Sequence, residues 1–562
     1  MTSDKKNISL LTDIFIKSGL SNIVISPGSR NAPIIISFAN NKKINAFSIV
    51  DERSAAFVAL GMSLQTKKTT AIACTSGSAV LNYASAISEA YYQKIPLLIL
   101  TSDRPPNQID IGDGQTIRQQ NVFENYIKNS FQLPLEIDSP EDFNMAEEII
   151  NKALNNCQFP EPGPVHINIP FAEPLYNTID KPVIGKLLKF PEIKSKINET
   201  EYINLANKWN DSNKVLIIAG QSQYNEELSN ILASLATFNN TSILTETTSN
   251  LKGQKFIDTI DNVVSTIGKD EVESFKPDII ISFGGHIVSK MIKKFLRANN
   301  SSIHWHISES GDKIDTYFCL TETIKYNPTL FFKNIKLKLN QSNSKYSELW
   351  INRRDLLNNK RISFLAQTEY SDLKVFDYLL SNIPSSTIIH LGNSTPVRYS
   401  QLFGSRQNIE YNSNRGVSGI DGQISTAVGY SYYSDKLNLL ITGDLGFFYD
   451  SNGLMNKYLK PNLKIIVINN SGGGIFRFIP GPDTSPNMEE FFVAEHNYSA
   501  KHICKAFDIQ YDNCKAFDEL ENSFSNFISQ KNDSASLLEI FTPKDSNGQI
   551  LRNYFTHLKG LH

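Results

Sequence analysis

One local pattern recurs along most of this chain and limits the folds that it can adopt. An apolar run of strand length ends at turn-forming residues and a helical pattern follows, as in "NIVISPGSR", "TAIACTSGSAVLNY" and "PLLILTSDRPP". Strands that alternate with helices in this way form parallel sheets, because each helix carries the chain back to the start of the next strand. The pattern predicts an α/β fold with helices on both faces of each sheet.

The alternation is interrupted twice, which predicts three domains. Residues 181–200 are charged, contain two prolines and show no period, so we interpret them as a linker. A polar, lysine-rich stretch near 340–370 indicates a second boundary. We expect doubly wound parallel-sheet domains at 1–180, 201–345 and 346–562, with the first and third as candidates for a shared fold. Ligands of such sheets bind at the carboxyl ends of the strands, so the residues after each apolar run are the candidates for chemistry.

The composition argues against several classes of protein. The 562 residues carry a formal net charge of −2, which gives no reason to expect binding to nucleic acid. No apolar run reaches the length of about 18 residues that a membrane helix needs, and the first residues lack the features of a secretion signal. The five cysteines are scattered without a CxxC pair, as is typical of reduced thiols. We therefore expect a cytoplasmic protein without a membrane span.

Two strand ends in the last domain carry oxygen-bearing side chains. Asp444 follows the apolar run of "LNLLITGDLG", and Asn470 follows that of "LKIIVINNSGGGIF", 26 positions later. Neighbouring parallel strands would bring both side chains to one edge, where carboxylate, carboxamide and backbone oxygens suit Mg²⁺. Gly472 and Gly473 allow a phosphate to approach the backbone closely. The alternative interpretation is a loop rich in turn-forming residues.

The spacing of Asp444 and Asn470 resembles the "GDG…NN" signature of thiamine diphosphate enzymes, from which Leu445 departs. The resemblance implies that Asp444, Asn470 and the Gly472 carbonyl hold Mg²⁺, with Mn²⁺ as the alternative metal, beside the diphosphate of the cofactor. It also implies a catalytic glutamate that faces the aminopyrimidine ring. Glu52, directly after the run "NAFSIVD", is the candidate. The alternative for this segment is a plain helix start, with an aspartate N-cap followed by a favourable charge in the first turn.

Six further motifs narrow the resemblance. They are "SPGSRNAPI" (26–34), "DERSAAF" (51–57), "TSGSAVLNY" (75–83), "TSDRPP" (101–106), "GQTIRQ" (114–119) and "SNRGVSGIDG" (413–422). Together they resemble the SEPHCHC (2-succinyl-5-enolpyruvyl-6-hydroxy-3-cyclohexene-1-carboxylate) synthases of menaquinone biosynthesis, in the same order along essentially the whole chain. The central domain matches only loosely. The resemblance implies a transferase that decarboxylates 2-oxoglutarate and adds the succinyl carbanion equivalent to isochorismate, with release of CO₂.

The same resemblance implies the site residues. Those at the isochorismate site are Ser29, Arg30, Arg104 and Gln115. Gln115 is also implied as a catalytic group that orients proton transfer. Those at the carboxylate derived from 2-oxoglutarate are Ser394, Arg398, Arg415 and, from the central domain, Lys290. Those at the cofactor are Glu52, Ser394, Ser418, Ile420, Asp444, Asn470, Gly472, Gly473 and Ile475, with Ile420 as an apolar wedge. By the same resemblance, Ile475 and Phe476 form an apolar wall near the substrate. Each arginine alone is compatible with a surface ion pair, but substrates with four carboxylates between them need several guanidinium forks.

The sequence departs from the family in the central domain and leaves two points open. Met291 stands where the family often has an arginine after Lys290, and Lys293 or Lys294 is the candidate to compensate. Asn469 has no expected role beyond the turn, and none of the nine histidines falls in the motifs.

The resemblance also implies a partner and leaves two alternatives. In this superfamily the two halves of a site come from different subunits, which implies a homodimer or a dimer of dimers in which Glu52 faces the partner subunit's Asp444. One alternative is another thiamine diphosphate enzyme, such as an acetolactate synthase or a 2-oxoacid decarboxylase, with less need for four loop arginines. The other is a nonenzymatic regulator that binds a nucleotide or a phosphate.

Overall fold

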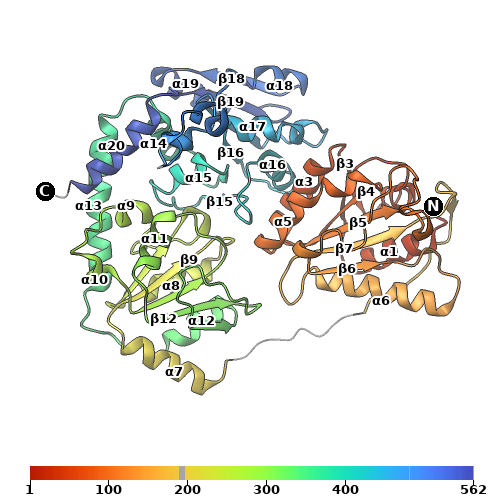
Figure 1. Cartoon of the computed structure of the whole chain (residues 1–562), viewed down its shortest axis with the longest axis horizontal. Helices are drawn as coiled ribbons and strands as arrows, with labels where there is room; N and C mark the ends of the chain where they lie inside the picture. The colour runs from red at the N-terminus through yellow and green to blue at the C-terminus, as the bar shows by residue number, and fades with distance from the viewer. Residues whose placement is uncertain (189–196, 480, 561–562) are drawn as a thin grey trace.

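The computed structural model describes residues 1–188, 197–479 and 481–560 and contains three parallel sheets (Figure 1). The predicted α/β class with three doubly wound sheets is confirmed. Both faces of each sheet are buried, as Ile23 and Val24 of one strand show by packing into separate apolar clusters. The middle of the predicted linker, residues 189–196, lies outside the described residues, and the predicted domain limits stay predictions.

The first sheet has six strands in the order β3-β2-β4-β5-β7-β6. The strands are β2 (Asn22–Ile25), β3 (Asn45–Ser48), β4 (Thr70–Cys74), β5 (Leu97–Asp103), β6 (Asn129–Gln132) and β7 (Pro164–Pro170). The helices around it are α1 (Lys6–Lys17), α2 (Ala32–Ala39), α3 (Glu52–Thr66), α4 (Ser78–Leu81), α5 (Ala84–Gln93) and α6 (Pro140–Asn156). A short antiparallel pair joins β1 (Thr2–Ser3) to β8 (Thr178–Ile179). The strand order reverses between β2 and β4, which is where ligands bind in sheets of this kind.

The third sheet repeats this topology in the order β15-β14-β16-β17-β19-β18. The strands are β14 (Ile388–Leu391), β15 (Glu410–Asn412), β16 (Asn438–Gly443), β17 (Leu463–Asn469), β18 (Gln510–Cys514) and β19 (Ser536–Phe541). The helices are α13 (Tyr346–Ala366), α14 (Asp372–Asn382), α15 (Thr395–Ser400), α16 (Gln423–Tyr432), α17 (Asp444–Tyr449), α18 (Lys501–Ala506), α19 (Phe517–Ser529) and α20 (Asn547–Lys559). In both sheets the first strand in the chain lies between the second and the third, so the two domains share a fold and α3 corresponds to α16.

The central sheet has the order β10-β9-β11-β12-β13. Its strands are β9 (Val215–Ala219), β10 (Thr241–Thr245), β11 (Ile279–Phe283), β12 (Ile303–Ser308) and β13 (Glu322–Lys325). Its helices are α7 (Glu199–Asn210), α8 (Glu226–Leu235), α9 (Ile260–Val264), α10 (Val272–Phe275), α11 (Lys290–Ala298) and α12 (Pro328–Lys336). The long helix α13 packs against α9, β10 and α20, so the central and third sheets share one apolar core.

Helices α3 and α16 cross closely enough to join the first and third domains. A Cβ on Gly61 would lie 2.0 Å from the Thr426 carbonyl oxygen, and one on Gly429 would lie 1.9 Å from the Val58 carbonyl oxygen. The two contacts are equivalent when the first domain is matched to the third. A pseudo-twofold axis therefore passes through the crossing. Apolar residues of both domains form one cluster around it.

Two sequence-based expectations concern the whole chain. All five cysteines are free, and burial raises the pKa of Cys157 and of Cys504 to about 12. These buried thiols stay protonated at neutral pH. In the part of the chain that the structure describes, no helix has the length and apolarity needed to cross a membrane.

Candidate active site

Arg30 and Arg104 lie together at the carboxyl edge of the first sheet. Arg30 is buried, donates to the Phe171 carbonyl at 3.0 Å and pairs with Glu173 at 3.1 Å. Burial lowers the pKa of Arg30, and the nearby charge of Arg104 lowers it further. Arg104 donates to the Gly114 carbonyl at 3.1 Å, while its Nε is buried with no hydrogen-bond partner among the described residues. Two guanidinium groups this close attract an anion.

The other two residues of the predicted isochorismate site lie at the same edge. Ser29 is exposed and precedes Arg30. Gln115 is exposed, and its carbonyl accepts a hydrogen bond from the Ser76 hydroxyl, just after β4, at 2.9 Å. A Cβ on Gly77 would lie 3.0 Å from the Gln115 side chain, so glycine is what allows this loop to approach the strand end.

Glu52 begins α3 directly after β3. Asp51 caps the helix by accepting a hydrogen bond from the Ser54 N–H at 3.1 Å. Glu52 is half-buried and accepts a hydrogen bond from Asn82 Nδ2 at 3.2 Å. The segment can start a helix and also supply a catalytic group. Asp51 provides the N-cap, which leaves the Glu52 carboxylate available for catalysis.

Asp444 and Gly472 meet at the carboxyl ends of the neighbouring strands β16 and β17 of the third sheet. Asp444 is buried, and its Oδ2 accepts a hydrogen bond from the Gly472 N–H at 2.9 Å. Gly472 has a φ of 140°, and a Cβ there would lie 2.7 Å from the Val493 carbonyl oxygen. Gly473 donates to the same carbonyl at 2.6 Å. Glycine is therefore required where this turn packs against the Val493 carbonyl.

Asn470 presents a free oxygen beside this turn. Its Nδ2 donates to Asp372 Oδ2 at 2.8 Å, while its Oδ1 is buried without a hydrogen-bond partner in the described residues. A buried oxygen of this kind is costly unless a ligand satisfies it. Together with the Asp444 carboxylate it fits a hard divalent cation that takes oxygen ligands. No cluster of three or more His, Cys, Asp or Glu side chains suited to a metal occurs among the described residues.

Two side chains near this site make contacts that the sequence did not indicate. His496 is buried, with its Nε2 3.3 Å from Asp444 Oδ2, and its ring stacks on Tyr498. It lies outside every motif, and no signal in the sequence links it to Asp444. Asn469 donates to the Tyr498 carbonyl at 2.9 Å and to Glu539 on β19 at 2.8 Å. Asn469 thus ties β17 to its neighbours while Asn470 faces the site.

A cationic cluster lies where the central and third domains meet. Arg415 is buried, and its Nη1 donates to Asn393 Oδ1 at 2.9 Å. Burial lowers the pKa of Arg398, Arg415 and Lys293, and the cationic neighbours of Arg415 and Lys293 lower theirs further. Glu246 faces this cluster and accepts hydrogen bonds from two backbone N–H groups before α11 at 2.7 Å each. Burial raises the pKa of Glu246 to about 7.

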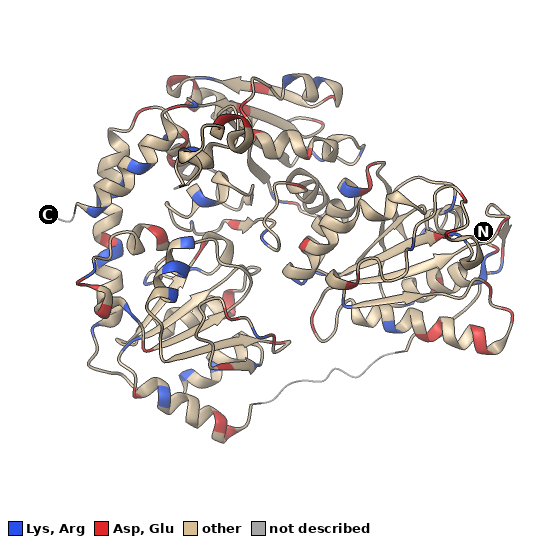
Figure 2. Cartoon of the chain, in the orientation of Figure 1, with Lys and Arg blue, Asp and Glu red and all other residues tan. Residues whose placement is uncertain are grey.

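Helix α11 carries a row of basic residues toward this cluster (Figure 2). Lys290, the predicted ligand, is exposed at the first position of the helix. Met291 packs against the apolar core, so its position on the helix faces away from the cations. Lys293 is half-buried and interacts electrostatically with Glu246 and Arg415, whereas Lys294 is exposed. The geometry favours Lys293 as the basic residue that compensates for Met291.

The remaining predicted residues follow strands β14, β15 and β17 of the third sheet. Ser394 and Ser418 have left-handed backbones, with φ of 72° and 64°. Ile420, Ile475 and Phe476 are each half-buried. Asn393, which the sequence analysis did not single out, holds the loop of Ser418 and Ile420 in place by donating to the carbonyls of Asn414 and Gly419, at 2.6 Å each.

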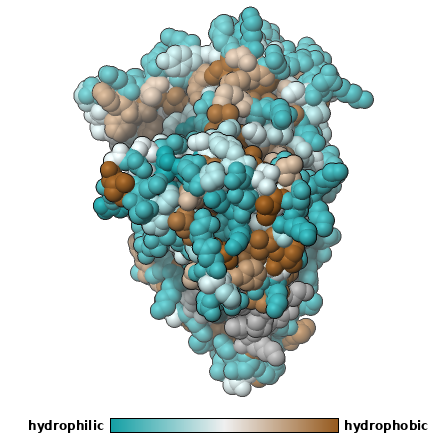
Figure 3. All heavy atoms as spheres, turned by 90° about the vertical axis from the view of Figure 1, so that its right-hand side faces the viewer, coloured by the Kyte–Doolittle hydropathy of each residue, from teal (hydrophilic) through white to brown (hydrophobic). Residues whose placement is uncertain are grey.

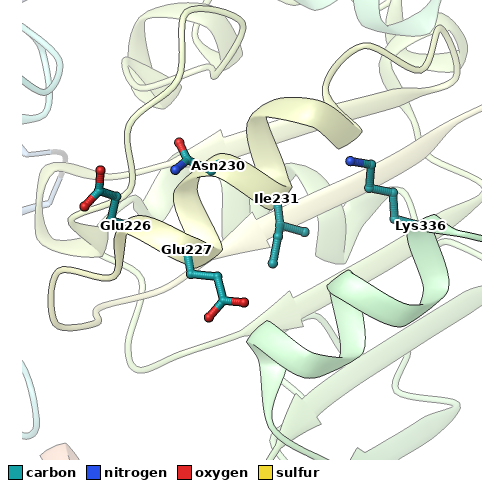
Figure 4. A pocket seen from close by; sticks show the side chains of 5 residues that line it. All are labelled: Glu226, Glu227, Asn230, Ile231 and Lys336. Atoms are coloured by element: carbon teal, nitrogen blue, oxygen red, sulfur yellow. The ribbon is translucent and has the colours of Figure 1, made fainter.

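The start of α3 touches the segment that follows Asp444 in the same chain, since Asn452 donates a hydrogen bond to Asp51 at 2.8 Å. None of the hydrogen bonds and ion pairs of the described residues joins Glu52 to Asp444 or Asn470. A surface hollow between α8 and α12 contains none of the predicted site residues (Figure 4). Its charges, Glu226 and Glu227 at the start of α8 and Lys336 at the end of α12, are those that stabilise helix ends.

Comparison with known proteins agrees with this geometry. A family described as "Thiamine pyrophosphate enzyme, N-terminal TPP binding domain" matches residues 8–132, and "Middle domain of thiamine pyrophosphate" matches residues 189–391. The solved structure of benzoylformate decarboxylase from Polynucleobacter necessarius matches with a TM-score of 0.71 at 16% identity, over 96% of this chain and 99% of that one. The fold and the site define a thiamine diphosphate-dependent enzyme.

Curated relatives narrow the class to one family. Proteins named 2-succinyl-5-enolpyruvyl-6-hydroxy-3-cyclohexene-1-carboxylate synthase are similar over nearly their whole length. Those from Christiangramia forsetii and Flavobacterium johnsoniae are 42% and 41% identical, with 97% and 98% of both chains covered. That from Porphyromonas gingivalis is 39% identical, over 99% of this chain and 98% of its own. The chain belongs to the SEPHCHC synthase family and is a transferase of the thiamine diphosphate class.

Proposed function

We propose that this enzyme decarboxylates 2-oxoglutarate and adds the remaining succinyl unit to isochorismate, in menaquinone biosynthesis. The observation that carries the proposal is the presence of two cationic clusters, one at the carboxyl edge of the first sheet and one where the central and third domains meet. One contains Arg30 and Arg104, and the other contains Lys293, Arg398 and Arg415. Buried cations of this kind suit substrates with several carboxylates, and a simple 2-oxoacid would leave one cluster without an anion.

Asp444, Asn470 and the Gly472 carbonyl would hold Mg²⁺, with Mn²⁺ as the alternative, and the adjoining glycine turn would receive the diphosphate. The unpartnered Oδ1 of Asn470 supports this fit. Thiamine diphosphate, when bound, would supply a nucleophilic thiazolium carbon for the 2-oxoacid carbonyl and a ring that takes up the electron pair left when CO₂ departs. Glu52 would hold a proton at the aminopyrimidine ring. Ile475 and Phe476 would exclude water beside the departing carboxylate.

A second copy of the chain would complete each site. Apolar side chains are exposed around Glu52, with Val50 62% and Leu81 49% exposed. Others are exposed near the Asp444 half, with Phe491 72% and Tyr498 67% exposed. At the end of the molecule that carries the first domain, hydrophobic residues form separate small groups among hydrophilic ones (Figure 3). A partner that covers both half-sites would bury the apolar residues that flank them. The cytoplasmic location stays a prediction, which fractionation of cells would test.

The decisive experiment supplies the purified protein with Mg²⁺, thiamine diphosphate, 2-oxoglutarate and isochorismate. We expect loss of both substrates in equal amounts, with CO₂ release that depends on the metal and the cofactor. Turnover of pyruvate at a comparable rate, or no use of isochorismate, would instead favour another carboligase or decarboxylase. Calorimetry that finds no Mg²⁺-dependent binding of thiamine diphosphate would exclude the whole class.

A further inference from the structure

The orientation of one buried amide determines whether the predicted metal site can form. Asn470 can offer a cation its Oδ1 but not its Nδ2, because an amide nitrogen has no lone pair available for a hard metal. Its Nδ2 donates to Asp372 Oδ2 at 2.8 Å, and its Oδ1 has no partner among the residues described. An ionised carboxylate only accepts hydrogen bonds, so the amide must turn its nitrogen toward Asp372 and its oxygen away.

Asp372 is itself held by contacts from two other elements. It is buried as the first residue of α14, and its backbone N–H donates to Asn547 Oδ1 at 2.8 Å. Its Oδ1 accepts a hydrogen bond from the Thr542 hydroxyl, just after β19, at 2.6 Å. Because Thr542 occupies one carboxylate oxygen, the other remains directed at Asn470.

The space beside the amide nitrogen is also restricted. A Cβ on Gly474 would lie 2.8 Å from Asn470 Nδ2, so the glycine leaves just enough space for the amide in this orientation. The other predicted ligand is fixed in a similar way, since Asp444 accepts hydrogen bonds from the backbone N–H groups of Leu445 at 2.7 Å and Gly472 at 2.9 Å.

We propose that Asp372 is a positioning residue that holds the Asn470 amide with its oxygen toward the divalent cation, and that it thereby sets the affinity for the cation and for thiamine diphosphate. This inference rests on the proposed function, because it assumes that Asn470 is a metal ligand. Residues that orient metal ligands typically change metal affinity by about 10- to 100-fold when they are replaced.

The test exchanges the two side chains. Asp372→Asn can donate to Asn470 Oδ1 and release the amide, and Asn470→Asp places two carboxylates against each other. Both should weaken Mg²⁺-dependent binding of thiamine diphosphate by about 10- to 100-fold. The double variant, Asp372→Asn with Asn470→Asp, keeps the charge of the pair and restores a donor facing an acceptor. We expect it to bind within a few-fold of the wild type.

Calorimetry of each apo protein with Mg²⁺ and thiamine diphosphate measures this affinity, and the Tm of the apo protein reports folding. Asp258→Asn, which neutralises a half-buried carboxylate that accepts a hydrogen bond from the Ser405 N–H, is the matched control and should bind normally. Wild-type affinity in Asp372→Asn, or a double variant no better than Asn470→Asp, would overturn the inference. The comparison of the double variant with Asn470→Asp remains decisive even if Asp372→Asn alone fails to fold. Absence of binding in the wild type would instead count against the proposed function.

Discussion

At the scale of single residues, Glu52 combines a fixed position with few competing contacts. Its backbone is held by the helix start that Asp51 caps, and its carboxylate accepts one hydrogen bond, from the exposed amide of Asn82. A side chain in this situation can leave Asn82 and share a proton with a ring nitrogen of the cofactor at little cost, because the lost hydrogen bond is replaced.

Glu52→Gln should reduce kcat by about 10²- to 10⁴-fold, the usual effect of removing a group that transfers a proton. Binding of thiamine diphosphate should change far less, because glutamine keeps the size and one acceptor. Steady-state assays and calorimetry check the two effects. Glu148→Gln, on the exposed face of α6, serves as the control for the substitution itself. Unchanged kcat in Glu52→Gln would contradict the assigned role.

Neighbouring lysines of α11 allow a matched comparison. Lys293→Ala should raise KM for 2-oxoglutarate by about 10-fold or more, since a hydrogen bond between charged groups contributes roughly 1.5–3 kcal/mol. Lys294→Ala, one residue away and exposed, should leave KM unchanged. If Lys290→Ala has the larger effect, the side chain predicted from the sequence, and not Lys293, is the ligand.

At the scale of secondary structure, the crossing of α3 and α16 depends on two glycines. Gly429→Ala would place a Cβ against the Val58 carbonyl and should lower the free energy of unfolding by about 1–3 kcal/mol, as overpacking typically does. Thermal unfolding measures this as a fall in Tm. Gly114→Ala is the control, because a Cβ there meets nothing within 4 Å. Equal Tm values for the two variants would show that the helices can separate without cost.

The turn before α11 depends on a buried carboxylate that titrates near neutrality. The pKa of Glu246 in the folded chain, about 7, lies above its ordinary value of 4.5, so protonated Glu246 stabilises the fold below about pH 4.5. That contribution is lost as the pH rises to about 7, at roughly 1.4 kcal/mol per pKa unit. Glu246→Gln stays neutral, so its Tm should fall less than that of the wild type between about pH 5 and pH 8. Identical profiles of Tm against pH for the wild type and Glu246→Gln would contradict this prediction. Other buried acids, such as Asp450, contribute equally to the wild type and the variant.

The sequence predicted the inner strands but not all of the edges. Strands β6, β13 and β18 each lie at the edge of a sheet and read "NSFQ", "ETIK" and "QYDNC". They lack the apolar runs by which the inner strands were recognised, because an edge strand is exposed to solvent and tolerates polar residues. Each of these segments is a strand because it pairs with the neighbouring strand, and its own residues do not predict that pairing.

At the scale of the whole molecule, the proposal that two chains share each site can be tested by mixing variants. Neither Glu52→Gln nor Asp444→Ala should be active alone, because each removes one half of every site. Chains mixed at equal amounts and allowed to exchange should recover about one quarter of wild-type activity, since half of the dimers are mixed and one of their two sites is intact. The assay is turnover after mixing, with unmixed variants as controls. No recovery would indicate that each chain forms its own site.

The sequence by itself determined the fold class, the repeat of strand and helix, and the residues that follow strand ends, including Asp444, Asn470 and Glu52. These depend on local patterns and on motifs a few residues long. Only the tertiary structure decided which side chains support them. Asp372 reaches Asn470 across 98 positions, and Glu89 of α5 accepts from the Gly416 N–H across 327. Such partners are brought together by packing between elements and domains. No local pattern in the sequence predicts this packing.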